Sequence, residues 1–413
     1  MLKIASIRAL EILDSRGRPS LKAYVALSNG VKGAASVPSG ASTGRAEAHE
    51  LRDGDLSRYQ GYGCMNAVQN INSEIAKELL DSPIIPQSQL DQVLINLDGT
   101  PNKSCLGANA MLAVSLAYAR ALANSQTIPL YQYFSSLLTV AEIRVPQLTV
   151  NLFSGGKHAG GQMPIQDVLI VPVSAQTTHE ALRDVQAVYQ AAVQLSLEKY
   201  GTRWLTADEG GLAPPFESIE AMFEDALQAI ENAGMQAGKD IALALDVAAS
   251  HFYIDGKYEL VGQTLDGRAM VETLSSWVKN YPIISLEDGL AEEDWKHWPL
   301  LMEAIGDRCL VLGDDLLCTQ TERIQKAIDL QAANALLLKV NQVGTLTEAV
   351  AAFQLAKSKN WRVTVSARSG ETEDNWLADL AVGWGGDQIK VGSITQSERL
   401  AKYNRLLEIE AGR

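Results

Sequence analysis

Acidic and basic side chains stand at the ends of short apolar runs in the second half of this chain. Asp246 ends "ALALD", Glu287 ends "PIISLE" and Asp314 follows "LVLG". Lys339 ends "ALLLK", and Lys390 ends "DQIK". Carboxylate oxygens without a neighbouring histidine or cysteine favour magnesium over zinc. A lysine beside such a cation is suited to proton abstraction, because the cation and partial desolvation lower the lysine pKa.

Two polar segments add to these groups. In "TVSARSG" an apolar run breaks into a tip that carries Arg368 and Ser369, a pattern typical of an anion site. In "ADEGG", Glu209 is a spare carboxyl that could act as a general acid. A plainer interpretation is open for each position, since strands often finish in a polar residue and a lysine can simply neutralise nearby acids. Six consecutive ends of this kind favour a functional site.

The apolar runs predict the scaffold that positions these groups. Continuous apolar runs suit strands that are covered on both faces. Glu287, Asp314, Lys339 and Ser366 follow one another at steps of 27, 25 and 27 residues, with helical patterns between the runs. Each step is the length of one βα unit. The series predicts a (β/α) barrel, in which all these strand ends meet at the C-terminal face.

The first third of the chain has a different pattern. "IASIRALEILDSRGRPSLKAYVALSNG" alternates between polar and apolar residues around two turn signals, which predicts antiparallel strands. A segment rich in Gly, Ser and Thr follows, "SVPSGASTG", and helical patterns dominate from about Cys64 to Tyr133. Strands followed by helices predict an α+β domain. We therefore place a cap domain at 1–135 and the barrel at 136–413.

Composition narrows the class of protein. A net charge of −14 argues against nucleic acid as a ligand, because phosphate backbones need a basic face. No apolar stretch approaches the roughly 18 residues of a membrane span, and the charged N-terminus lacks a signal core. The 4 cysteines form no CxxC pair, which favours a reducing, cytoplasmic location. An anionic substrate would need its own Lys, Arg or metal ions.

The order of these motifs resembles the enolase family over essentially the whole chain. The motifs are "LDSRGRPSL", "SVPSGASTG", "DGTPNKSCLGANAMLAVSLA", "SGGKHAGG", "DEGGLAP", "LALDVAAS", "SLEDGL", "GDDLL", "LLLKVNQVGTLTEA", "SGETEDNWLADL" and "SERLAKYNRLLEIE". The resemblance implies an α/β fold: a modified (β/α)8 TIM-like barrel preceded by an α+β N-terminal cap domain. It also implies dehydration of 2-phosphoglycerate to phosphoenolpyruvate. Enzymes of this kind use a lysine base together with magnesium.

The resemblance also implies a role for each site residue. Lys339 abstracts the α-proton, Glu209 assists departure of the hydroxyl group, and Asp167 is a further catalytic carboxylate. The implied binding groups are Arg368 and Ser369 for the phosphate, Lys390 for the carboxylate side, Asp246, Glu287 and Asp314 for the first Mg²⁺, and Ser42 for the second. His158 would close over the bound substrate from its Gly-rich loop. The implied partners are a small phosphorylated carboxylic acid and a second copy of the chain, in a homodimer or higher homo-oligomer.

Three positions depart from the family pattern. Ala367 stands where the family has histidine, Gln396 where it usually has arginine, and Asp167 where it has glutamate. The Asp167 carboxylate is one methylene shorter and reaches about 1.5 Å less far. Three functions therefore stay open: dehydration of 2-phosphoglycerate, the same enolisation on a related phosphorylated or phosphonylated acid, and a non-catalytic binding role.

Overall fold

The computed structural model of the chain describes residues 1–41, 43–140, 142–201 and 205–412, with residue 158 described by its backbone alone. Two of the predicted site groups are affected. Ser42, the predicted ligand of a second Mg²⁺, lies outside the described residues. The side chain of His158 lies outside them as well. The roles of both stay predictions.

An antiparallel sheet begins the chain, as the alternating sequence predicts. β1 (Ile4–Leu13) pairs with β2 (Pro19–Leu27), and β2 pairs with β3 (Lys32–Ser36). Gly17 adopts a φ of 69° in the turn between β1 and β2, a conformation that glycine tolerates without strain. The remaining elements of this part are the 3₁₀ turn Tyr59–Gly61, α1 (Met65–Asn70), the π-helical turn Ile71–Ile75, α2 (Ala76–Leu79), α3 (Gln87–Asp98), α4 (Ala108–Ser125) and α5 (Leu130–Ser135).

Small residues allow α4 to lie directly on this sheet. Almost the whole of α4 is buried, and most of its buried positions are alanine or leucine. Gly33 of β3 lies under the helix: a Cβ at this position would come within 2.2 Å of the Ala117 carbonyl oxygen and 2.3 Å of the Ala121 backbone nitrogen. Any larger residue at position 33 would therefore push the helix off the sheet.

The later strands close into a barrel. They are β4 (Gln147–Ser154), β5 (Asp167–Pro172), β6 (Ile241–Asp246), β10 (Ile283–Glu287), β11 (Leu310–Gly313), β12 (Ala335–Leu338), β13 (Arg362–Ser366) and β14 (Gln388–Gly392). Their order around the barrel is β10-β11-β12-β13-β14-β4-β5-β6. β5 runs antiparallel to both of its neighbours, and the other pairs are parallel. The α/β class and the modified TIM-like barrel are confirmed.

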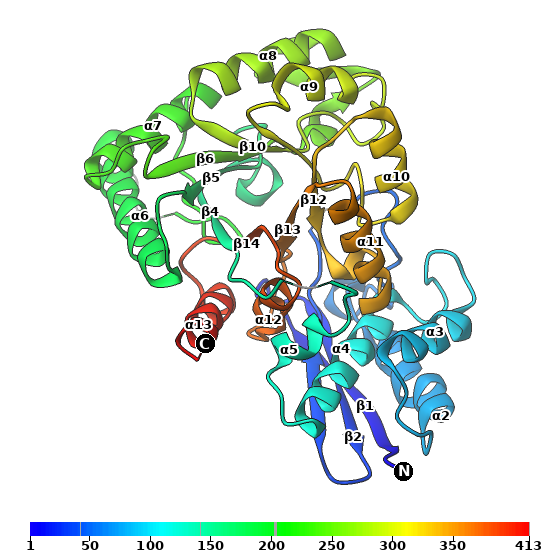
Figure 1. The fold of residues 1–413 in the computed structure, drawn as a ribbon. Helices are drawn as coiled ribbons and strands as arrows, with labels where there is room; N and C mark the ends of the chain where they lie inside the picture. Colours follow the sequence, from blue (N-terminus) through cyan, green and yellow to red (C-terminus); the bar gives the residue numbers. More distant parts are fainter. Residues whose placement is uncertain (42, 141, 202–204, 413) are drawn as a thin grey trace.

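Helices cover the outer wall of the barrel (Figure 1). They are α6 (Thr178–Tyr200), α7 (Ile219–Asn232), α8 (Gly267–Asn280), α9 (Trp298–Ile305), α10 (Thr321–Leu330), α11 (Leu346–Ser358), α12 (Trp376–Gly383) and α13 (Ser397–Ala411). Shorter elements are the small sheet β7 (Tyr253–Ile254), β8 (Lys257–Leu260) and β9 (Gln263–Leu265), with 3₁₀ turns at Gly156–Ala159, Ala249–Phe252 and Val340–Gln342. Every residue of β5 and of β6 is buried, as their continuous apolar runs predict.

Contacts between distant parts of the chain hold the N-terminal sheet beside the barrel (Figure 1). Ser39 forms an isolated β-bridge with Gly370, which follows β13. Asp374 pairs with Arg120 of α4 at 2.7 Å, and its carboxylate also accepts the Ser36 backbone N–H at 2.8 Å. The end of β3 is thus bound to the segment that carries the predicted anion tip. The domain limits of 1–135 and 136–413 stay predictions.

Two further features concern the cysteines and the helix lengths. The four cysteines are free thiols, and all except Cys105 are buried. Within the described residues, no helix has both the length and the apolar character that crossing a bilayer requires.

Candidate active site

The register of three neighbouring strands lines up three carboxylates at one end of the barrel. Asp167 lies opposite Asp246, and Asp246 lies opposite Glu287. Asp246 and Glu287 are the last residues of β6 and β10, whereas Asp167 is the first residue of β5. Because β5 runs antiparallel, it begins where its neighbours finish. This is the C-terminal end of the parallel strands, where catalytic groups of such barrels lie.

Lys390 of β14 bridges two of these carboxylates. Its Nζ lies 2.8 Å from Asp246 Oδ2 and 2.7 Å from Glu287 Oε2, and all three side chains are buried. Burial disfavours the charged form of Lys390, but the two carboxylates more than offset this and raise its pKa well above the ordinary value. Lys390 is therefore a fixed cation at neutral pH, suited to holding a substrate carboxylate.

Lys339, the predicted base, lies directly after β12 and contacts Asp314 through its Nζ. Burial is the largest single influence and disfavours the charged form of Lys339, but the nearby carboxylates, Asp314 first and then Glu287, together more than offset it, so the lysine pKa is raised. The sequence predicts the opposite direction, from a cation next to Lys339. The lowered pKa beside a bound cation stays a prediction, and among the protein's own groups the nearest charge is the Asp314 carboxylate in direct contact. Lys339 must lose its proton before it can act as a base.

A second trio of acids overlaps the predicted metal ligands. Among the described residues, ligand atoms of Asp288, Asp314 and Asp315 lie within 4.8 Å of one another, so this trio shares only Asp314 with the predicted set. Asp288 is already engaged, since its carboxylate accepts the backbone N–H groups of Asp314 at 3.0 Å and Asp315 at 2.8 Å. Asp288 thereby fixes the turn that presents Asp314 to the barrel mouth.

The chemistry of these side chains fits a magnesium ion. Asp246, Glu287, Asp314 and Asp315 offer carboxylate oxygens, the ligands that Mg²⁺ prefers. Burial and the Asp314 charge raise the pKa of Asp315 to about 7. Burial and the Asp246 charge raise the pKa of Glu287 well above its usual range. Crowded acids with raised pKa values carry a repulsion that a divalent cation would relieve.

We expect Mg²⁺ to stabilise this protein more at pH 8 than at pH 5.5. An acid whose folded pKa is raised stabilises the fold fully below its unfolded pKa, about 4, and that contribution is lost as pH rises through the folded pKa. For Asp315 the window ends at about 7. Mg²⁺ binds the deprotonated carboxylates that accumulate above this pH, so it should raise Tm by roughly 5 °C at 100 times its Kd.

Thermal melts with Mg²⁺ and with EDTA at the two pH values test this. Asp315→Asn should reduce the pH dependence of the EDTA melt, because it removes one of the crowded charges. Asp307→Asn changes an exposed acid elsewhere and is the matched control. An equal Tm increase at both pH values would contradict the assignment of these acids to a cation site.

The segment after β13 presents Arg368 and Ser369 at the same end of the barrel. Both side chains are almost fully buried, and both line one cavity together with Lys339 and Lys390. The buried Arg399 guanidinium donates to the Arg368 carbonyl oxygen at 2.7 Å and to the Ser369 carbonyl oxygen at 2.6 Å. Arg399 therefore fixes the backbone of this tip, as an anion site needs.

The turn between β1 and β2 supports the tip from the N-terminal side. Arg16 Nη1 donates to Ser369 Oγ at 3.1 Å, and the Ala41 backbone N–H donates to the same oxygen at 2.8 Å. Ser15 Oγ donates to the Ser369 carbonyl oxygen at 3.2 Å. The motif "LDSRGRPSL" thus gains a positioning role that the sequence alone did not assign.

The predicted acid and its neighbour lie on the opposite side from the base. Glu209 Oε2 accepts a hydrogen bond from Asn151 Nδ2 at 3.1 Å, and Asp167 Oδ1 accepts one from Ser154 Oγ at 2.5 Å. Burial, together with the nearby Glu209 charge, raises the pKa of Asp167 well above its usual range. The raised pKa favours the protonated form of Asp167 close to Glu209, an arrangement suited to general acid catalysis.

One cavity, with room for about 30 Å³ of solvent, connects most of the predicted groups. The predicted residues that line it are Glu209, Asp246, Asp314, Lys339, Arg368, Ser369 and Lys390. Glu287 and Asp167 adjoin it through Asp246, their register partner. Ala367 forms part of the wall and is buried, so the position where the family has an imidazole is an apolar surface.

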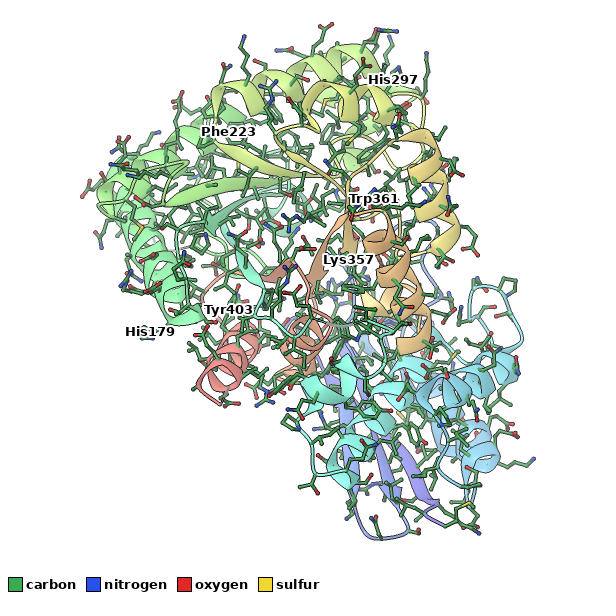
Figure 2. The ribbon with its side chains drawn as sticks, viewed as in Figure 1. His179, Phe223, His297, Lys357, Trp361 and Tyr403 are labelled. Atoms are coloured by element: carbon green, nitrogen blue, oxygen red, sulfur yellow. The ribbon has the colours of Figure 1, made fainter. Side chains whose placement is uncertain are left out.

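The structure adds one imidazole that the sequence analysis did not single out. His251 lines the same cavity as Ala367, from the turn after β6. β6 and β13 are four places apart in either direction around the barrel, so the two positions face the mouth from opposite sides. Of the other histidines, His179 lies on α6 and His297 is the N-cap of α9, both on the outer wall (Figure 2). The signal for His251 was its place five residues after Asp246.

Gln166 is a second lining residue that the sequence analysis passed over. Its Nε2 donates to Asp246 Oδ2 at 2.9 Å, next to Lys390. It directly precedes Asp167, and a polar pair at the start of an apolar strand was the available signal. Gln396, the third departure from the family pattern, is the N-cap of α13 and lines none of this cavity.

Comparison with protein-family models agrees with this geometry. The N-terminal part matches the model described as enolase, N-terminal domain, over residues 4–134. The barrel matches the model described as enolase, C-terminal TIM barrel domain, over residues 142–412. The two matches follow one another in family order and together cover nearly the whole chain. With the closed barrel and the cluster of acids and lysines at its mouth, they show that this chain belongs to the enolase family.

Proposed function

We propose that this protein is an Mg²⁺-dependent lyase that dehydrates 2-phosphoglycerate to phosphoenolpyruvate. The observation that carries the proposal is that Lys339 and Glu209 line one cavity with the carboxylates of Asp246 and Asp314. A base and an acid on opposite walls can remove a proton and a hydroxyl group from adjacent carbons. Bound Mg²⁺ would supply charge stabilisation for the enolate formed from the substrate carboxylate.

The protein's own groups divide the work in this proposal. Lys390 orients the substrate carboxylate, and Arg368 with Ser369 orients the phosphate, which fixes the α-carbon beside Lys339. Lys339 takes the α-proton when Asp314 no longer pairs with it, because the contact with Asp314 raises the pKa of the lysine. Glu209 donates a proton to the departing hydroxyl, and Asp167, a neighbouring carboxyl with a raised pKa, would return a proton to Glu209.

An absorbance assay tests the proposal directly. Purified protein incubated with 2-phosphoglycerate and Mg²⁺ should produce the ultraviolet absorbance of the enolpyruvate product, and EDTA should abolish it. Exchange of the substrate α-proton with deuterium oxide, without product, would instead indicate a different leaving group. Failure of the protein to bind Mg²⁺ in calorimetry would overturn the lyase proposal and leave a non-catalytic binding role.

Glu209→Gln should separate the two halves of the reaction. We expect formation of enolpyruvate to fall by about 10²–10⁴-fold, because the hydroxyl loses its proton donor. Exchange of the α-proton, which depends on Lys339, should stay within about tenfold of the wild type. Nuclear magnetic resonance in deuterium oxide measures the exchange, and absorbance measures the product. An equal fall in both rates would contradict the assignment of Glu209 as the acid.

A related acid is the second candidate substrate. The observation that favours it is the wall of the cavity: Ala367 is apolar, and His251 supplies an imidazole from the opposite side. A site altered in this way suits a 2-substituted acid that carries its phosphoryl or phosphonyl group, or its leaving group, in another orientation. A panel of such acids in the proton-exchange assay tests this. His251→Ala should lower the rate of proton exchange only for the acid that contacts the imidazole.

We also propose that the protein works as a homodimer or larger homo-oligomer in a reducing cytoplasm. The support is family membership for the oligomer and the free, mostly buried cysteines for the compartment. Light scattering at micromolar concentration tests the oligomeric state, and a monomer would contradict it.

A further inference from the structure

Behind the anion tip, Glu47 connects three parts of the candidate site. Its side chain is 7% exposed although it belongs to an irregular segment of the N-terminal part. Its carboxylate accepts hydrogen bonds from Arg368, from Gln342 and from the Gly44 backbone N–H. None of these hydrogen bonds belongs to a strand or a helix. They therefore depend on the charge and the length of the Glu47 side chain.

The contact with Arg368 is a two-point ion pair. Arg368 Nη1 lies 2.9 Å from Glu47 Oε2, and Arg368 Nη2 lies 3.2 Å from Glu47 Oε1. Asn341 Oδ1 accepts a further hydrogen bond from Nη1 at 3.0 Å. A two-point pair fixes the plane of a guanidinium as well as its position. Burial disfavours the charge of Arg368, but Glu47 more than offsets this and raises the arginine pKa.

Glu47 approaches Arg368 from the side away from the reaction. Arg368 lines the cavity that contains Lys339 and Lys390, whereas Glu47 and Asn341 line a separate hollow of about 550 Å³ behind it. The carboxylate therefore acts on a bound anion mainly through the guanidinium that it pairs with. It reduces the net positive charge that the anion meets, and it sets the angle at which the remaining N–H groups point.

Two further contacts tie this pair to the groups that handle the proton. Gln342 Nε2 lies 3.4 Å from Glu47 Oε1 and 2.9 Å from Asp314 Oδ1, so one amide bridges the anion side and the predicted metal ligand. The Gly44 backbone N–H donates to Glu47 Oε1 at 3.0 Å. The Gly/Ser-rich segment, the arginine and the acid beside Lys339 thus share one carboxylate.

We propose that Glu47 is a positioning residue that holds Arg368 in a fixed plane and limits its attraction for phosphate, so that the anion binds productively and leaves after turnover. This inference rests on the proposed function, in which Arg368 binds the phosphate of the substrate. Without the carboxylate, phosphate should bind more tightly but in a poorer orientation, so the affinity should increase while kcat falls.

Glu47→Gln is the test, because the amide keeps the shape and removes the charge. We expect inorganic phosphate, measured by calorimetry in the presence of Mg²⁺, to bind about tenfold more tightly than to the wild type. In the 2-phosphoglycerate assay KM should fall, and kcat should fall by about 10- to 100-fold. A substitution that only loosened the fold would weaken phosphate binding, so weaker or unchanged phosphate binding would overturn the proposal.

Three further variants keep the inference separable from the proposed function. Glu47→Asp retains the charge at shorter reach and should lower kcat with phosphate affinity near the wild-type value. Arg368→Met should abolish the affinity gain in a double variant with Glu47→Gln. Glu11→Gln, a largely buried acid of β1 that pairs with Arg58 at 2.5 Å and lines neither cavity, is the matched control and should change neither quantity. The phosphate measurements decide the inference even if 2-phosphoglycerate is not turned over.

Discussion

Replacing Lys339 with methionine should lower the rate of α-proton exchange by about 10²–10⁴-fold. No other described lysine except Lys390 lines the cavity, and Lys390 is held between Asp246 and Glu287 at 2.8 and 2.7 Å. Methionine has nearly the same length and preserves packing, so the loss reports the amine. Nuclear magnetic resonance in deuterium oxide, with 2-phosphoglycerate and Mg²⁺, follows the exchange without requiring product.

A matched control separates loss of the base from loss of a buried ion pair. Lys103 is also buried and contacts Glu348, but it does not line the cavity. Lys103→Met should therefore reduce Tm while it leaves the exchange rate per folded molecule near the wild-type value. Exchange that survives in Lys339→Met at the wild-type rate would show that another group is the base, and it would remove the main support for the proposed reaction.

Placing an imidazole at position 367 should change the rate of dehydration strongly. We expect Ala367→His to increase dehydration of 2-phosphoglycerate by about 10²–10³-fold, which is the usual worth of one donor aimed at developing charge. The backbone is suited to the change: the Ala367 N–H donates to the Lys390 carbonyl oxygen at 2.9 Å, which holds the side chain toward the cavity. Steady-state kinetics by absorbance measure the gain.

Ala367→Leu is the control for this variant, because it fills the same space without a donor. It should lower the rate, since the cavity has room for only about 30 Å³ of solvent. If Ala367→His fails to increase the rate, the alanine is not what limits the reaction with 2-phosphoglycerate. If the variant instead loses activity on a related acid in the proton-exchange panel, the apolar wall is part of the native specificity.

The barrel could be predicted from the sequence because each of its strands is indicated by a short run of neighbouring residues. Each strand is a short apolar run, and each run ends in the residue that reaches the mouth, as Asp246 and Glu287 illustrate. The reversal of β5 could not be deduced from its residues. "DVLIVP" is apolar throughout, and a strand buried on both faces has the same composition in either direction. Only the family resemblance implied a modified barrel.

The groups that the residues alone did not identify act across long sequence separations. Glu47 meets Arg368 across 321 positions, and no spacing rule connects them. The direction of the Lys339 pKa among the protein's own groups could not be predicted for a related reason. That direction depends on which charge lies nearest, and the contact with Asp314 is a tertiary one. Residue types at strand ends thus indicate the chemistry, whereas their mutual distances determine the protonation states.

The reversed strand has a consequence for how this protein family could change. Because β5 runs backwards, the segment between Ser154 and Asp167 crosses directly from one strand to the next at the mouth, without a helix on the outer wall. Insertions or exchanges in this segment would reshape access to the cavity while the helical wall and the ends of the parallel strands kept their places. Because Gln166 and His158 belong to this segment, a change there would alter access to the cavity and the contacts of the site together, with the helical wall untouched.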